Sequence, residues 1–161
     1  MTPLERLVGP LPTASDYREW SDLVSEAVAK AAVSDPDRFI TILSEEPTLF
    51  ESGTIVFALG AVKDARVIPL LVPALKNKDS NVRWSAAHAL EDHRDPRVVD
   101  AFIAALRDRA PTVRAVIVEA LGKFRDRRAL EPLREALERP SNQKDDYLCK
   151  LLEAAIKKLH A

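Results

Sequence analysis

The sequence predicts an all-α protein, an α–α superhelix built from helical hairpins in tandem. The 161-residue chain has only four glycines and few aromatic or β-branched runs, which favours helices over a sheet. Several residues recur with a spacing of 31 positions. Within each unit, apolar residues recur with the spacing of one helix face. We therefore expect about nine helices, an initial helix followed by four pairs.

The repeat is clearest between residues 64 and 125. The residues that recur at 31-residue spacing are Asp64, Asp95 and Asp126; Leu75, Leu106 and Leu137; Leu59, Leu90 and Leu121, each after an alanine; and the pairs Val82-Arg83 and Val113-Arg114. Aspartate at the start of a unit can accept hydrogen bonds from the free N–H groups of a first helical turn. Pro96 stands where a helix loses no hydrogen bond to proline. Each unit therefore begins with a capped helix.

The first expected helix precedes the regular repeats. Ser15 can cap a helix that continues to about Val33, and residues 1–14 read as a tail. The side chains expected to be buried on this helix are Tyr17, Trp20, Leu23, Val24, Ala27, Val28 and Ala31. Because the end of a repeat array needs a cover over its last apolar stripe, we expect this helix to act as a cap.

Four hairpin repeats follow, at residues 35–63, 64–94, 95–125 and 126–161. In the third repeat, the first helix is expected from about Val98 to Arg107. The second helices carry one buried stripe at i, i+4, i+7, i+8 and i+11. Its members are Val82, Ala86, Ala89, Leu90 and His93; then Val113, Ile117, Ala120, Leu121 and Phe124; then Leu148, Leu152, Ala155, Ile156 and Leu159. The last set keeps the stripe if the loop at 138–146 absorbs four extra residues.

The bulk composition indicates one domain, residues 1–161, in a soluble protein. A net charge of −1 gives no overall attraction to nucleic acid or to an anionic membrane. The single cysteine, Cys149, excludes an internal disulfide and a thiolate-built zinc site. The chain shows no signal-peptide pattern, and its longest apolar run, residues 55–62, is too short to span a bilayer. We expect a cytoplasmic monomer.

The segments "VRWSAAHALEDHRDPRV" and "VRAVIVEALGKFRDRRALEPLREAL" resemble HEAT repeats, in particular the short Ala-Leu-Gly subtype of phycobilin lyase-like bacterial proteins. The resemblance covers about residues 48–161. Asp79 occupies the family's aspartate position and Ala110 replaces it one repeat later. Glu91 stands where Gly60 and Gly122 fill the family's glycine position. The resemblance implies a HEAT-like solenoid whose second helices line a concave surface.

The face opposite the buried stripe is the candidate partner-binding surface, because successive helix residues turn by about 100°. Its candidate residues are Phe57, Trp84, His88, Glu91, Glu119 and Lys150. Aromatic anchors contribute much of the energy at protein interfaces, and Trp84 is the largest side chain on this face. Two interpretations of Trp84 stay open, a solvent-facing anchor or a side chain packed against a neighbouring repeat.

A regular set of arginines follows one flank of the second helices. Its members are Arg83, Arg94, Arg114 and Arg125. Such a basic row can recognise phosphate or carboxylate groups. The simpler interpretation, which we prefer, is that these arginines are solvated or pair with acids on the other flank such as Asp92. Glu91 and Glu119 on the inner face argue against nucleic acid as the partner.

Catalytic patterns are missing from the sequence. We find no nucleophile elbow, glycine-rich phosphate loop or Walker motif, and the spacing of His88, Glu91 and Asp92 is a weak metal signal common on charged helices. We therefore predict no cofactor, no metal and no enzymatic activity. The expected function is a scaffold that binds another protein or peptide on the concave face. The alternatives are a phycobilin lyase-like chromophore-binding or chaperone-type protein, and a nucleic-acid-binding HEAT-like protein.

Overall fold

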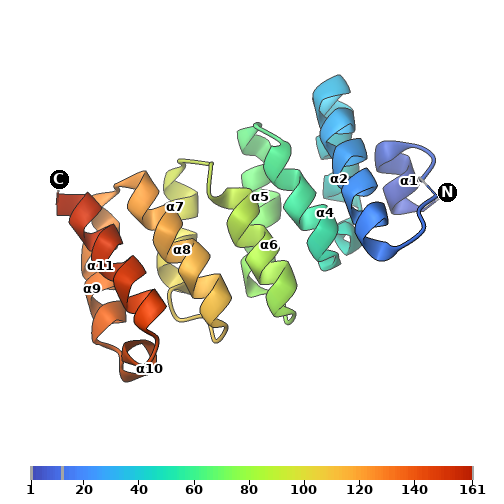
Figure 1. The fold of residues 1–161 in the computed structure, drawn as a ribbon. Helices are drawn as coiled ribbons and strands as arrows, with labels where there is room; N and C mark the ends of the chain where they lie inside the picture. Colours follow the sequence, from blue (N-terminus) through green and yellow to red (C-terminus); the bar gives the residue numbers. More distant parts are fainter. Residues whose placement is uncertain (1, 12, 161) are drawn as a thin grey trace. The chain divides into compact units, whose positions relative to one another are not determined.

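The computed structural model describes residues 2–11 and 13–160, which contain eleven α-helices and no strand (Figure 1). The all-α prediction is confirmed. The chain divides into two compact units, Met1–Leu90 and Glu91–Ala161. The boundary lies inside the second predicted repeat, directly after its second helix. That residues 1–161 form a single domain stays a prediction.

The first unit begins with a helix where the sequence analysis expected a tail. α1 (Pro3–Val8) starts with a capping box, in which the Thr2 hydroxyl accepts from the Glu5 N–H at 3.2 Å and the Thr2 N–H donates to the Glu5 carboxylate at 2.6 Å. Leu4 and Leu7 are buried, and α1 packs against the next two helices. The cap of the first hairpin therefore includes α1.

α2 (Tyr17–Ser34) is the predicted initial helix, with two corrections. Asp16, not Ser15, is its N-cap: the Asp16 carboxylate accepts from the Glu19 N–H at 2.9 Å, because the helix starts one residue later than expected. The buried residues at its centre are Val24, Val28 and Ala32, whereas Tyr17 is 71% exposed and Trp20 is half-buried. Burial of α2 therefore begins one to two turns after its start.

The rest of the first unit consists of two hairpins. Their elements are α3 (Pro36–Glu45), a 3-10 helix (Pro47–Glu51), α4 (Gly53–Ala58) with a 3-10 end (Leu59–Ala61), α5 (Ile68–Leu71) between two 3-10 helices (Ala65–Val67 and Val72–Lys76), and α6 (Ser80–Leu90). α2, α4 and α6 lie side by side (Figure 1). The short α5 has a proline within it and another just after it, Pro69 and Pro73, which cannot donate to the helical ladder.

The second unit is more regular. It contains α7 (Pro96–Ala105), α8 (Pro111–Phe124), α9 (Leu130–Glu138) after a 3-10 helix (Arg127–Ala129), α10 (Pro140–Gln143) and α11 (Asp146–His160). α8 packs against α7 and α11, and α9 packs against α11. The four extra residues of the last repeat are absorbed in the expected loop, where they form part of the short α10.

The repeated aspartates cap their helices as predicted. The carboxylates of Asp64, Asp95 and Asp126 accept from the N–H two residues later at 2.9, 2.8 and 3.0 Å. In each case the residue two positions later is an arginine whose guanidinium also bonds the same carboxylate. These bonds, first from the Arg97 side chain and then from its N–H, lower the pKa of Asp95 to about 2.

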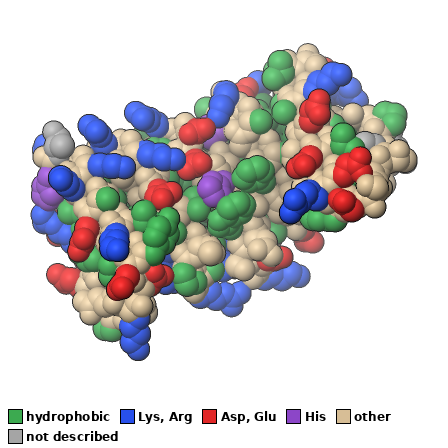
Figure 2. Space-filling view, in the orientation of Figure 1, with side chains coloured by type: hydrophobic (Ala, Val, Ile, Leu, Met, Phe, Trp, Pro, Cys, Tyr) green, Lys and Arg blue, Asp and Glu red, His purple; other side chains and the backbone are tan. Residues whose placement is uncertain are grey.

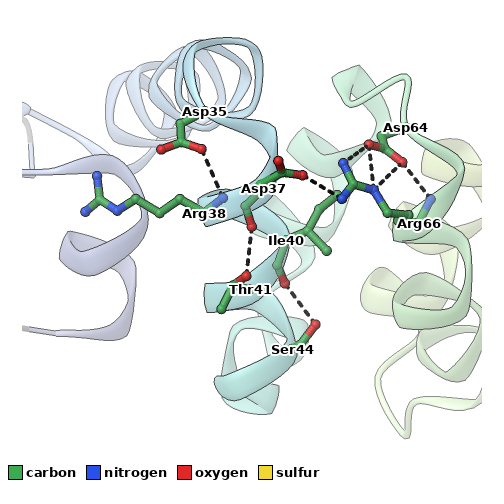
Figure 3. Close-up of polar contacts among 8 residues, drawn as sticks. All are labelled: Asp35, Asp37, Arg38, Ile40, Thr41, Ser44, Asp64 and Arg66. Carbon is green, nitrogen blue, oxygen red and sulfur yellow. Dashed lines mark hydrogen bonds and ion pairs between the residues drawn. The ribbon is translucent and has the colours of Figure 1, made fainter.

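Two of these arginines also join neighbouring hairpins. Arg66 Nη1 donates to the Asp37 carboxylate of the preceding hairpin at 2.6 Å (Figure 3). Arg128 Nη1 makes the same kind of bond to Asp100 at 2.6 Å in the second unit. One arginine therefore holds its own helix start and reaches the hairpin before it.

The predicted apolar stripes form the core. Of their fifteen positions, all but His93, Phe124 and Ile156 are buried, and these three are half-buried. The two glycines of the stripe helices lie at close helix contacts. A Cβ on Gly60 would lie 2.9 Å from Ala89 Cα, and one on Gly122 would lie 3.1 Å from Ala155 Cα. Glycine is needed there because the neighbouring backbone occupies the space of a side chain.

Candidate functional site: an aromatic groove on the first unit

Three of the predicted partner-binding side chains meet on α4 and α6. The rings of Phe57 and Trp84 stack with centroids 5.9 Å apart and an interplanar angle of 7°. The His88 ring lies edge-on to Trp84 at 4.2 Å and to Phe57 at 6.1 Å. Figure 2 shows hydrophobic side chains beside a histidine over this part of the first unit. The sequence periodicity therefore placed these three residues on one surface correctly.

The position of Trp84 combines the two interpretations that the sequence left open. Trp84 and His88 lie one turn apart on α6, opposite the buried Val82 and Ala86, so the stripe forces them outward. Trp84 packs on Phe57 of the neighbouring helix, yet Trp84 is 36% exposed and Phe57 is 48% exposed. The aromatic pair is therefore held by a repeat contact and still offers ring surface to solvent.

The aromatic pair forms one wall of a groove between α2, α4 and α6, with a volume of about 540 Å³. We call it the aromatic groove. Its lining residues are Tyr17, Ser21, Ser25, Gly53, Thr54, Phe57, Asp79, Asn81, Trp84 and Ser85. The Tyr17 hydroxyl and Thr54 Oγ1 are hydrogen-bonded at 2.9 Å, which connects the start of α2 to α4. A surface of this kind, with aromatic faces beside hydroxyls, suits a polypeptide better than a purely apolar ligand.

Asp79 supplies the charge of the aromatic groove. Among the described residues that line it, Asp79 is the one ionisable acid and none is basic. Asp79 Oδ1 accepts from the Asn81 N–H at 2.8 Å at the start of α6. A carboxylate near two exposed aromatic rings favours a cationic group, since both the charge and the ring faces attract it.

The other predicted partner-binding residues belong to the second unit. Lys123 Nζ donates to the Glu91 carboxylate at 2.9 Å, and this bond is the main reason that the pKa of Lys123 is raised, with Glu119 adding to it. Lys150 is exposed on α11. Glu91 and Glu119 therefore form a charge cluster with Lys123, and the structure does not bring Lys150 into that cluster.

The prediction that four arginines form a solvent-facing basic row is wrong for two of them, Arg83 and Arg114. Arg83 is only 5% exposed, and its Nη1 donates to the carbonyls of Asn77 and Lys78 at 2.9 and 3.1 Å. Arg114 in the second unit is half-buried and makes the same kind of bond, with its Nη1 donating to the Asp108 carbonyl at 2.7 Å. These carbonyls lie in the turns that follow the preceding helices, and the arginine side chains supply donors to them. Arg94 and Arg125 are exposed.

The polar side of the aromatic groove was not predicted from the sequence. Tyr17 was expected to be buried and instead lines it. The hydroxyls of Ser21 and Ser25 stand one turn apart on α2, a weak signal for a polar helix face. Asp79 was noticed only for the resemblance. No sequence pattern relates α2 to α6, so the groove itself could come only from the structure.

Over residues 2–11 and 13–160, no group of three or more His, Cys, Asp or Glu side chains is arranged to hold a metal ion. In the same residues, no helix is both long and apolar enough to cross a membrane.

The family model for HEAT repeats matches residues 36–109 and 89–146. These matches cover most of the chain and include α3 to α10. The chain belongs to the HEAT-repeat family. Such repeats commonly serve as protein-interaction scaffolds. No curated protein matches the chain. The phycobilin lyase-like subtype stays a resemblance.

Proposed function

We propose that this HEAT-repeat protein is a non-catalytic scaffold that binds a segment of a partner polypeptide in the aromatic groove. The observation that carries the proposal is the stacked pair of Phe57 and Trp84, whose rings are held in place by repeat packing while a third to a half of each remains exposed. Rings that are already ordered lose little conformational entropy on binding, which makes them effective anchors.

The partner segment is proposed to carry a lysine or arginine flanked by apolar residues. The aliphatic part of such a side chain would lie along the ring of Trp84, and its charge would approach Asp79. The hydroxyls of Ser21 and Thr54 line the same groove, where they bond each other and Thr54 also bonds the Tyr17 hydroxyl. A hydroxyl can both donate and accept, so these groups can still bond the carbonyls and N–H groups of an extended segment.

The test uses short random peptides displayed on phage and selected against the whole protein. Selected peptides should be enriched in basic residues next to apolar ones. Trp84→Ala should weaken their binding about 30-fold, the effect of losing an anchor worth about 2 kcal/mol. Asp79→Asn keeps an oxygen for the Asn81 N–H but removes the charge, so it should weaken binding of the basic peptides by about 3- to 10-fold.

Tyr147→Ala is the matched control. Tyr147 is 62% exposed on α11 of the second unit, so this variant removes a comparable exposed aromatic outside the groove. It should leave peptide binding unchanged. Peptides that bind Trp84→Ala as tightly as the unaltered protein would contradict the proposal. Selected peptides that are acidic would contradict the role of Asp79.

The alternatives make different predictions in solution. A phycobilin lyase-like or chaperone-type role would give a bound chromophore or a visible absorption change on mixing with a bilin. A nucleic-acid-binding role would give duplex affinity that falls steeply as salt is raised. Either result, with no selectable peptide, would replace the scaffold proposal.

A further inference from the structure

The second unit contains a cleft that the proposed function does not use. It lies where the end of α7, the start of α8 and the turn before α10 meet, and its volume is about 380 Å³. We call it the arginine cleft. Its lining residues are Leu106, Arg107, Asp108, Arg114, Arg139, Ser141 and Asn142.

Three guanidinium groups converge on this cleft without carboxylate partners. In the part of the chain that the structure describes, no ion pair of Arg107, Arg114 or Arg139 is found. The arginines at the helix starts, by contrast, are each paired with an aspartate: Arg66, Arg97 and Arg128. Arg107 is exposed, and Arg114 and Arg139 are half-buried. Three positive charges therefore line one small volume.

Backbone bonds hold two of the three side chains in position. Arg114 Nη1 donates to the Asp108 carbonyl at 2.7 Å, and Arg139 Nη1 donates to the Leu106 carbonyl at 3.0 Å. Each guanidinium has five N–H donors, so several remain for a ligand. The Nε–H of Arg114 is buried and has no hydrogen-bond partner. A buried donor without a partner is costly unless a ligand satisfies it.

The electrostatics of the cleft agree with this arrangement. Burial, followed by the like charge of Arg107, lowers the pKa of Arg139; Glu135 acts in the opposite direction, and Arg114 adds to the lowering. Asp108 is the one acid among the lining residues, and its carboxylate accepts from the Ala110 N–H at 2.8 Å, which commits one oxygen to the turn. The charge that remains favours an anion.

The wall opposite α8 is well ordered by buried polar contacts. Asn142 is only 2% exposed, and its Nδ2 donates to the Ala136 carbonyl at 2.7 Å, so α10, which contains Ser141 and directly follows Arg139, is fixed to α9. The Ser141 hydroxyl lines the cleft as a further donor. The cleft therefore has preformed walls on both sides.

We propose that the arginine cleft is a binding site for a phosphate group in its dianionic form. A carboxylate has one negative charge and two oxygens, which a single guanidinium can satisfy. A phosphate dianion has two charges and at least three terminal oxygens, which matches three guanidinium groups and one hydroxyl better. This inference concerns the second unit and is independent of the aromatic groove.

The phosphate group could be carried by a small molecule or by a phosphorylated side chain of a partner, and the experiment has an arm for each. Calorimetry of the whole protein is run with inorganic phosphate, and separately with a peptide containing phosphoserine, against chloride of the same ionic strength. Saturable binding is expected in at least one arm. The tighter of the two arms identifies the source.

The variants are chosen so that folding does not decide the outcome. Arg107→Gln changes an exposed side chain, and Arg139→Gln changes a half-buried one; each should weaken phosphate binding at least tenfold with little change in the melting temperature of Arg107→Gln. Arg107→Lys keeps the charge but loses the forked donors and should recover only part of the affinity. Arg127→Gln removes one exposed charge of the same unit outside the cleft and is the matched control.

Three results would overturn the proposal. The first is equal weakening by Arg127→Gln, which would show general charge attraction. The second is equal binding of a peptide with glutamate in place of phosphoserine, which would show no preference for a dianion. The third is duplex DNA binding that depends on Arg107 and Arg139 while phosphate does not saturate, which would assign the cleft to nucleic acid.

Discussion

Among the described residues, each unit contains one aromatic stack between two helices, and the two stacks have nearly the same geometry. Phe57 and Trp84 in the first unit have centroids 5.9 Å apart at 7°, and Phe102 and Phe124 in the second unit have centroids 5.9 Å apart at 5°. Phe102 is fully buried and Phe124 half-buried, whereas the first pair is exposed. The two stacks therefore differ in burial and not in ring geometry: one belongs to the core and the other to the surface.

The difference arises from the place of each ring in its repeat. Phe102 lies on the inner face of α7 and Phe124 occupies the last position of the buried stripe of α8. Trp84 lies opposite the corresponding stripe of α6, and Phe57 is the exposed large side chain of α4, whose Ile55, Val56 and Ala58 are buried. The same scaffold thus uses one aromatic pair to close its core and the other to shape the aromatic groove.

Phe102→Ala should produce the largest loss of stability, about 3–5 kcal/mol, because a fully buried ring leaves a cavity. Denaturant unfolding followed by circular dichroism measures it. Phe102→Leu is the control and should lose clearly less. A loss below about 1 kcal/mol for the alanine variant would mean that the second stack does not support the core.

Gly60→Ala should have the next largest effect, about 2 kcal/mol of destabilisation, because the new Cβ would lie 2.9 Å from the Ala89 backbone. Gly122→Ala is the matched variant in the second unit. Its contact is 3.1 Å and it stands inside a regular α-helix, where alanine gains about 1 kcal/mol over glycine. Thermal melts should show the first variant clearly less stable than the second. The reverse order would contradict this account of the close contacts.

Trp84→Ala should reduce stability by about 1–2 kcal/mol, less than Phe102→Ala, because the ring is partly exposed but keeps its contacts with Phe57 and His88. The same denaturant experiment measures it, and no partner is needed. A loss as large as that of Phe102→Ala would show that Trp84 belongs to the core and would weaken its proposed role as an anchor.

The smallest expected effect is the pH dependence of the aspartate caps, which both units contain. The folded pKa of Asp95, about 2, lies below the unfolded value of about 3.9. The stabilisation from its charge is therefore present above about pH 4 and is lost as the pH falls toward about 2. Asp95→Asn should lower the melting temperature at pH 7 and much less at pH 2, where about half of the Asp95 carboxylates are protonated in the folded protein. Asp22→Asn, which changes an exposed carboxylate on α2 that makes no helix cap, is the control variant. A difference as large at pH 2 as at pH 7 would contradict the role of charge.

The core could be predicted because it follows from the 31-residue spacing and the period of a helix. The position of Arg83 could not, since its helix position indicates a flank, whereas in the structure its guanidinium turns inward and donates to the carbonyls of Asn77 and Lys78. α1 could have been predicted, because Thr2 and Glu5 have the spacing of a capping box directly before and within a short helix.

The candidate site was predictable only in part. Phe57, Trp84 and His88 share a face by periodicity, and their contacts follow once α4 and α6 pack. The contribution of Tyr17 depends on how α2 lies along α4, which is set by side-chain packing between residues far apart in the sequence. The arginine cleft likewise depends on the turn that carries Arg139, within a segment that the sequence indicated only as a longer loop.

The aspartate and arginine at each helix start have a consequence for how such a chain can evolve. Asp95 and Arg97 lie two residues apart, so a tandem duplication of the segment from 95 to 125 would copy both partners together. The Arg97 of the second copy would then lie 28 residues after the Asp100 of the first copy, which is the separation of Arg128 and Asp100 now. The two could form the same bond. A gene segment of this length therefore carries its own helix start and its own joint, and the array can gain or lose hairpins without new residues being selected at the junction.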